Sequence, residues 1–145
     1  MKLENILAEW DNDAQLDRTK LDIVALGLPQ MHAKYIRCLS HERLILRKYE
    51  ADMKTLKFDK FDFYCDGPSE DTPTTWIQSA PPRGRIIKTD VARYLDADKD
   101  IISLSLKIGM QQEKIETLKS IVDTVSRLGF QVKNAIDWMR FQSGN

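Results

Sequence analysis

The sequence contains few cysteines and histidines and no long hydrophobic run. Its 145 residues include two cysteines, Cys38 and Cys65, and two histidines, too few for a disulfide framework or a His-rich metal site. No apolar run approaches the roughly 18 residues that a membrane-spanning helix needs. The first residues, Met-Lys-Leu-Glu-Asn, lack the apolar stretch of a signal peptide. We therefore expect a metal-free cytoplasmic protein with reduced thiols.

The motifs of common enzymes are also absent. The chain has no Gly-x-x-x-x-Gly-Lys-Ser/Thr, no Gly-x-Gly-x-x-Gly, no Cys-x-x-Cys and no His-Glu-x-x-His, which argues against nucleotide-dependent and metalloprotease chemistry. Acidic residues such as Glu113 and Glu116 stand beside lysines, as on a solvated helix face. We therefore expect no enzyme and no cofactor, and the acids form no convincing cluster for the metal of a nuclease.

The net charge is zero, but the charges are unevenly distributed. Lysines and arginines number 22, as do acidic residues, which excludes a histone-like polycation. Residues 34–65 nevertheless carry eight basic and five acidic groups, residues 66–80 none and three, and residues 81–95 four and one. Salt screens remote charges over about 8–10 Å. The two local basic excesses are therefore the candidates for contact with a polyanion.

The first half of the chain has the periodicity of helices. Leu3, Ile6, Leu7 and Trp10 predict a short amphipathic helix, and Asp17 or Thr19 can cap the next one. Gly27 and Pro29 are expected to break or kink that helix near its start. Beyond them a heptad seam with two polar interruptions predicts a long helix: Tyr35, Leu39, Glu42, Leu46, Tyr49, Met53, Leu56, Lys60 and Phe63. Such a seam packs against another helix of the same chain or is shared between subunits.

A second seam follows in the last third of the chain. Asp98 or Asp100 is expected to open this helix, and Gly129 to end it as a C′ residue. Its seam comprises Ile101, Leu104, Ile108, Gln111, Ile115, Leu118, Val122 and Val125. A last short helix, about 131–142, is expected to carry a sticky face for oligomerisation, formed by Val132, Ile136 and Met139.

Residues 65–85 differ in character from the helical blocks. Cys65-Asp66-Gly67-Pro68 is expected to end the long helix, and four of the chain's prolines lie between residues 68 and 82. Such an insert is a long loop or a loose β-hairpin. We therefore predict a mainly α protein, organised as one oligomerising chain 1–145. It divides into N-terminal helices (1–64), an irregular insert (65–95) and C-terminal helices for assembly (96–145).

Two segments are candidates for binding single-stranded nucleic acid. Lys54, Lys57 and Lys60 recur every three residues on the long helix, and three aromatic residues interleave with them as possible base-stacking groups: Phe58, Phe61 and Tyr64. Cations follow phosphates and rings stack on any base. The second segment offers three cations on the insert for phosphate contact: Arg83, Arg85 and Lys88. Alternatively, the rings are core residues and the lysines are merely solvated.

The order and spacing of several segments resemble those of the UvsY recombination-mediator family of tailed bacteriophages. The segments include Leu16-Asp17-Arg18-Thr19-Lys20-Leu21, Leu46-Arg47-Lys48-Tyr49-Glu50-Ala51, Lys60-Phe61-Asp62-Phe63-Tyr64, Ala97-Asp98-Lys99-Asp100 and Gly129-Phe130-Gln131-Val132-Lys133. The resemblance covers nearly the whole chain apart from the Pro-rich insert. It implies a largely helical protein assembled as a ring or open barrel of six or seven copies.

The resemblance also implies a function and partners. These are sequence-independent binding of single-stranded DNA and loading of a RecA-like phage recombinase onto DNA coated by a single-strand-binding protein, in the host cell cytoplasm. The family's basic pair maps imperfectly, since Lys60 keeps one position while Phe58 occupies the other, with Lys57 beside it. The competing interpretation is an oligomeric coiled-coil protein with a structural or chaperone-like role and no nucleic-acid binding.

Overall fold

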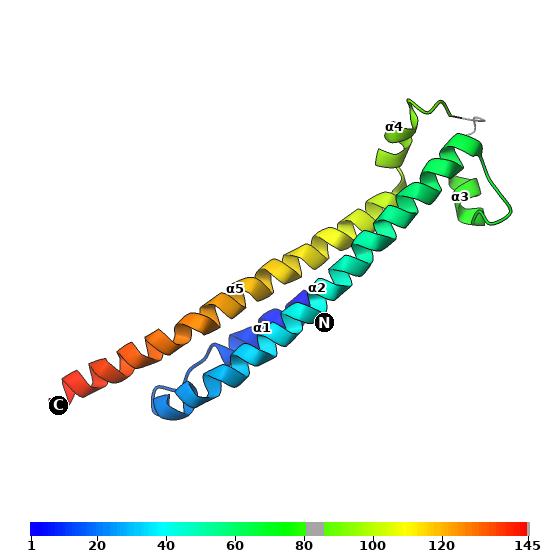
Figure 1. Cartoon of the computed structure of the whole chain (residues 1–145). Helices are drawn as coiled ribbons and strands as arrows, with labels where there is room; N and C mark the ends of the chain where they lie inside the picture. Colours follow the sequence, from blue (N-terminus) through cyan, green and yellow to red (C-terminus); the bar gives the residue numbers. More distant parts are fainter. Residues whose placement is uncertain (81–85, 145) are drawn as a thin grey trace. The chain divides into compact units, whose positions relative to one another are not determined.

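The computed structural model describes residues 1–80 and 86–144, and these residues form helices and connecting turns without a β-strand. The helices are α1 (Leu3–Asp13), α2 (Leu21–Asp66), α3 (Thr74–Ser79), α4 (Val91–Asp96) and α5 (Lys99–Gln142) (Figure 1). The prediction of a mainly α protein is therefore confirmed. Over the described ranges, no helix combines the length and the apolar composition needed to cross a bilayer.

Helix α2 is a single element of 46 residues, longer at its start than the sequence suggests. Pro29 lies inside it, so of the expected break or kink the break is excluded. Proline removes one backbone donor, but the helix continues because the residues beyond Pro29 pack along a seam. Asp17 accepts hydrogen bonds from Thr19 and so forms a turn before the helix instead of capping it. At the other end Gly67 adopts φ 81°, as the predicted stop requires.

Helix α5 is likewise continuous over 44 residues. The predicted stop at Gly129 and the separate short helix after it are wrong. Gly129 does not adopt a positive φ, and the buried side chains Leu128 and Val132 on either side of it continue the packed face. The predicted start is confirmed. Asp98 Oδ1 accepts hydrogen bonds from the backbone N–H groups of Asp100 and Ile101 at 2.9 and 3.0 Å, which is an N-cap.

The insert contains two short helices where the sequence predicts a loop or a hairpin. Helices α3 and α4 have six residues each, and the described part of the insert contains no strand pair. Trp76 anchors α3, with its ring 5.7 Å from that of Phe63 in an edge-on arrangement. Val91 is fully buried and anchors α4. Arg83 and Arg85 lie outside the described residues.

The chain forms two compact units, and each contains segments of both long helices. One unit comprises Met1–Leu44 with Gln111–Asn145, and the other comprises Ile45–Met110. Every residue of both predicted seams is buried or half-buried, so the heptad interpretation is confirmed. Within each unit the α2 seam faces the α5 seam of the same chain, which favours the first of the two alternatives for these seams.

In the unit formed by Met1–Leu44 and Gln111–Asn145, α1 and α5 both contact α2. The ring of Trp10 meets that of Tyr35 edge-on at 5.6 Å, and the Tyr35 hydroxyl donates to Asp13 at 2.8 Å. The polar interruption at Glu42 is fully buried. It accepts hydrogen bonds from the Gln111 side chain, through its carboxylate and, at 2.9 Å, through its backbone carbonyl. Polar seam residues of α2 and α5 therefore pair with each other.

The unit Ile45–Met110 is an antiparallel helical hairpin with the insert at its tip. Residues later in α2 meet residues earlier in α5, since Lys107 lies 5.0 Å from the Tyr49 ring and Lys60 lies 3.0 Å from Asp98. All the DNA-binding candidates that the structure describes belong to this unit. The candidate interface therefore lies on the hairpin and its insert.

Candidate nucleic-acid interface

Three exposed residues form a flank of α2 beside its seam, hereafter the basic flank: Lys54, Lys57 and Phe61. A helix turns about 100° per residue, so Lys54 and Lys57 lie about 60° apart and Lys57 and Phe61 about 40° apart. Lys54 and Lys57 are exposed, and in the part of the chain that the structure describes neither makes an ion pair. Phe61 is 40% exposed. The flank therefore presents two cations and a ring to solvent.

Lys60, the third lysine of the predicted row, is a buried residue. It is 2% exposed, and its ammonium lies 3.0 Å from Asp98 and 2.9 Å from Asp100. The Trp76 ring centroid lies 4.1 Å from the same nitrogen. Two steps of about 60° carry the row about 120° around the helix, from the flank into the seam. The expectation that Lys60 is an exposed cation is therefore wrong.

Asp98 connects the elements around Lys60. Its carboxylate caps α5, pairs with Lys60 and accepts a 2.6 Å hydrogen bond from the Tyr64 hydroxyl. Burial by itself would raise the pKa of Asp98, but the hydrogen bonds from Tyr64, the Ile101 N–H and Lys60 hold that pKa below its ordinary value. The pKa of Tyr64 is raised, first by burial and then by its bond to Asp98. This network is structural, because its charges satisfy one another.

The three aromatic candidates also differ in exposure. Phe58 is 68% exposed and points away from the seam, since it lies midway between Leu56 and Lys60. Tyr64 is half-buried, with its ring 5.8 Å from that of Tyr94 and its hydroxyl occupied. Phe58 and Phe61 are therefore available to a partner, whereas Tyr64 is committed to the fold.

The insert contributes one described candidate. Lys88 is exposed in the turn before α4, where Asp90 N–H donates to the Ile87 carbonyl at 2.8 Å. The predicted contacts Arg83 and Arg85 fall outside the described residues, so they stay predictions.

Sequence reasoning missed Arg47, which extends the basic flank by one heptad. Seven residues separate Arg47 from Lys54 and Lys54 from Phe61, and a step of seven residues changes the angular position by only about 20°. Arg47 is exposed. The phase of the α2 seam was the signal that would have included Arg47 and removed Lys60.

The oligomerisation candidates at the C-terminal end of α5 differ in exposure. Val132 is 3% exposed, so it serves the core of a single chain and offers little surface to another copy. Ile136 is half-buried and Met139 is 51% exposed. Beside them the rings of Trp138 and Phe141 stack at 5.6 Å on the outer surface. The exposed apolar surface of this end is therefore mostly aromatic.

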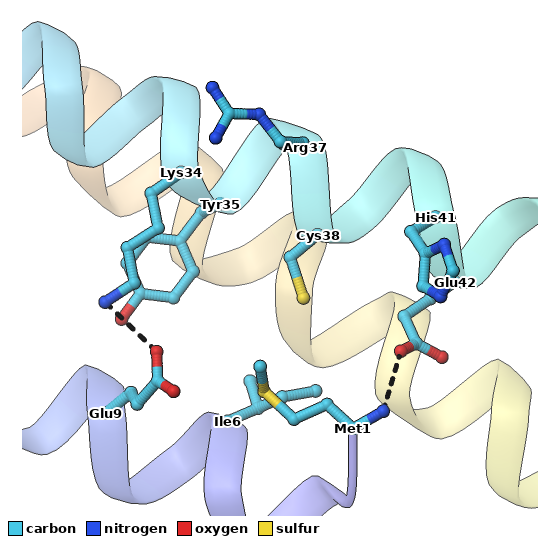
Figure 2. Close-up of a pocket in the computed structure, with 9 residues that line it drawn as sticks. All are labelled: Met1, Ile6, Glu9, Lys34, Tyr35, Arg37, Cys38, His41 and Glu42. Carbon is cyan, nitrogen blue, oxygen red and sulfur yellow. Dashed lines mark hydrogen bonds and ion pairs between the residues drawn. The ribbon is translucent and has the colours of Figure 1, made fainter.

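A separate pocket of about 500 Å³ lies between α1 and α2 (Figure 2). Several of its charged groups are paired. Lys34 bridges Glu9 at 3.0 Å and Asp13 at 2.7 Å, and Glu42 accepts from Lys114 at 3.1 Å. Figure 2 shows the Cys38 thiol facing the pocket, and burial raises the pKa of this thiol, which disfavours the reactive thiolate. The pocket therefore offers no activated nucleophile.

The described side chains provide no candidate metal centre. Over residues 1–80 and 86–144, no three histidine, cysteine or acidic side chains gather in a way that could hold a metal. A helical hairpin whose exposed cations, unpaired among the described residues, lie beside an exposed ring has the features by which proteins hold a flexible polyanion through charge and stacking.

The family is shown by the sequence. Residues 9–145 match the family described as "Recombination, repair and ssDNA binding protein UvsY", and the chain belongs to this family. It is 22% identical over 144 residues to the recombination protein uvsY of Enterobacteria phage T4, covering 99% of each chain.

Solved structures show the same fold. One crystal structure of the bacteriophage T4 recombination mediator protein UvsY matches with a TM-score of 0.81 at 20% identity, over 98% of this chain and 99% of that one. A second crystal form matches with a TM-score of 0.79 at 22% identity, over 99% of both chains. At these identities the likeness supports the helical architecture. It does not assign DNA-contacting residues in this chain.

Proposed function

We propose that this protein binds single-stranded DNA without sequence preference and acts as a recombination mediator. In this role it helps to load a RecA-like phage recombinase onto strands coated by a single-strand-binding protein, in the cytoplasm of the host cell. Membership of the UvsY family supports the role. The observation in this chain that carries it is the basic flank, where Lys54 and Lys57 are exposed and unpaired among the described residues.

The basic flank suits phosphate contact rather than base reading. Lysine ammonium groups are mobile point charges that follow phosphates, and an exposed ring stacks on any base. Arg47 extends the flank along the helix, and Lys88, Arg83 and Arg85 are the candidates on the insert. Lys60 is excluded from this set because its ammonium already has two carboxylate partners.

The chain is neutral overall, so a single flank provides few phosphate contacts. Assembly into a ring or open barrel of six or seven copies would repeat the flank in every copy. Linked weak sites bind through effective concentration, and this would convert modest contacts into usable affinity. A ring would also hold the strand on a bent path that favours the recombinase over the coat protein.

The test measures the affinity of the wild type and of Lys54→Ala/Lys57→Ala for a fluorescent single-stranded oligonucleotide at several salt concentrations. For the wild type, log affinity should fall with log salt by about 0.7 for each neutralised phosphate. The double variant should bind at least tenfold more weakly with a shallower slope, because each copy of a multivalent assembly lacks two of its cations.

The matched control removes two other exposed lysines, Lys20 and Lys119, by alanine substitution. This control should bind like the wild type. If both double variants weaken binding equally, general charge rather than the basic flank is responsible. If the wild type is not retained on single-stranded DNA at low salt, the structural or chaperone-like interpretation replaces the proposal.

A further inference from the structure

Two outward positions of the hairpin Ile45–Met110 carry exposed apolar side chains, one on each long helix. Phe58 on α2 lies midway between the seam residues Leu56 and Lys60, and Leu106 on α5 lies midway between Leu104 and Ile108. A residue midway between two seam positions four apart lies about 180° from them. Phe58 is 68% exposed and Leu106 is 67% exposed. The hairpin therefore presents these two side chains in opposite directions.

The two surfaces differ in shape. Phe58 is a single large ring, whereas Leu106 belongs to a group of four exposed residues of α5 with the i, i+3, i+4, i+7 spacing: Ile102, Ser105, Leu106 and Gly109. Ile102 is 43% exposed, and a Cβ atom placed on Gly109 would meet nothing within 4 Å. Four helix residues at this spacing form the hole that receives a knob from a facing helix, and two of these four are small.

We propose that Phe58 of one copy inserts into the Ile102–Ser105–Leu106–Gly109 hole of the next copy. This proposal rests on the ring or open barrel proposed above and names the surfaces that would join its subunits. Because the knob and the hole are different surfaces, the contact is heterologous, and it forms the ring or open barrel when the rotation between neighbouring copies closes. The occupant of the hole is therefore a second copy of this chain.

Charge supports this pairing. When copies stand side by side in the same direction, α2 of one copy runs antiparallel to α5 of its neighbour. With Phe58 opposite Leu106, Asp62 lies opposite Ile102 and within about one helical turn of Lys99. Asp62 and Lys99 are both exposed, and in the described part of a single chain neither forms an ion pair. Opposite charges thus meet at the end of the junction.

The arrangement leaves Lys57 accessible. Phe58 lies about 100° around α2 from Lys57 and about 40° from Lys54, so a neighbouring helix seated on Phe58 leaves Lys57 outside the junction and places Lys54 at its rim. The proposal therefore assigns Phe58 to assembly rather than to base stacking, and it leaves Phe61 as the ring beside the cations.

The experiment uses two full-length variants, Phe58→Asp and Leu106→Asp, measured by light scattering separately and mixed in equal amounts. Each variant alone should have a mass well below that of the wild type, because one side of every junction is lost. Mixed together, they should form a two-copy species, since Leu106→Asp retains its knob and Phe58→Asp retains its hole. Leu26→Asp, at an 83% exposed leucine outside both surfaces, is the control and should keep the wild-type mass.

A second variant fills the hole without adding charge. Gly109→Leu has open space in a single chain and replaces the weakest interior helix former after proline, so each monomer should remain folded, with unchanged or higher helicity by circular dichroism. Its assembled mass should nevertheless fall. Full assembly of Gly109→Leu, or of either aspartate variant, would overturn the proposal. So would a mixture that forms no two-copy species.

DNA binding is read separately, so the two proposals can fail independently. The mixed two-copy species should still bind a single-stranded oligonucleotide, at lower affinity than the wild type because fewer flanks are linked. If the wild type binds DNA normally but stays monomeric, the basic flank remains supported as the DNA-binding surface and the knob-and-hole junction is contradicted.

Discussion

Lys57 and Lys60 are three residues apart on one helix and have opposite surroundings. Lys57 is exposed, whereas Lys60 is 2% exposed between two aspartates and under the Trp76 ring. Their chemistry is identical, so the difference arises from the seam, which includes position 60 and excludes position 57. A row of lysines at a spacing of three cannot remain on one face of a helix. The outer face of α2 therefore suits binding, and the inner face holds the fold.

Removing the inner cation should have the largest effect. Lys60→Ala should lower the free energy of unfolding by about 3–5 kcal/mol, because it leaves the buried carboxylate of Asp98 without its cation. Lys57→Ala should change that free energy by no more than about 0.5 kcal/mol, as exposed substitutions usually do. Urea denaturation followed by circular dichroism measures both. Equal losses would contradict the inner-versus-outer distinction.

Low pH should reduce stability mainly through the buried carboxylates of the inner face. The folded-state pKa of Asp98 is lowered, so its contribution to stability is complete above its unfolded pKa of about 4 and is lost as pH falls through the lowered value. Glu42 acts in the same direction, since hydrogen bonds from Gln111 and Lys114 outweigh the effect of its burial. Asp98→Asn should therefore lose less stability than the wild type between pH 7 and pH 3.

The control for this acid experiment is the exposed Asp62. Asp62→Asn should retain the pH dependence of the wild type, because Asp62 is exposed and makes none of the ion pairs found among the described residues. Urea midpoints at the two pH values provide the measurement. A parallel acid response of Asp98→Asn and the wild type would show that the Asp98 network does not drive the acid loss.

The salt dependence of DNA binding should distinguish the two lysines a second time. Lys57→Ala should reduce the slope of log affinity against log salt by about 0.7 for each phosphate that is no longer neutralised. Lys60→Met fills the seam with a side chain of similar length. Provided that circular dichroism shows this variant to be folded, its slope of log affinity against log salt should equal that of the wild type. A reduced slope in a folded Lys60→Met variant would show that the buried ammonium reaches phosphate.

The smallest expected effect concerns Gly129, where the sequence predicts the end of a helix. Gly129 is exposed within α5 and lacks a positive φ, and a Cβ atom placed on it would meet nothing within 4 Å. Gly129→Ala should therefore raise the free energy of unfolding by about 0.5–1 kcal/mol. A loss of stability, measured by thermal unfolding, would indicate the left-handed helix end that the sequence predicts.

The amino-acid sequence by itself predicted the two long helices and their buried faces. Every residue that the heptad steps assigned to the seams of α2 and α5 is buried or half-buried, including Glu42, Lys60 and Gln111, because burial on a helix follows the 3.5-residue period of the side chains. The sequence also predicted the helix cap at Asp98 and the helix end at Gly67, since caps depend on local backbone geometry. The order and spacing of several sequence segments pointed to the UvsY family, and the family match over residues 9–145 then showed that the chain belongs to it.

Only the tertiary structure decided which polar residues are partners and that the long helices continue through Pro29 and Gly129. Nothing local to Lys60 reveals that Asp98 and Asp100, far along the chain, neutralise it. Nothing local to Pro29 or Gly129 reveals that packing across the seam outweighs their helix-breaking tendency. Propensity is worth about 1 kcal/mol at a glycine and about 3 kcal/mol at a proline, and a seam that buries a side chain at each turn provides more. The same packing buried Lys60 and left Lys54 and Lys57 exposed.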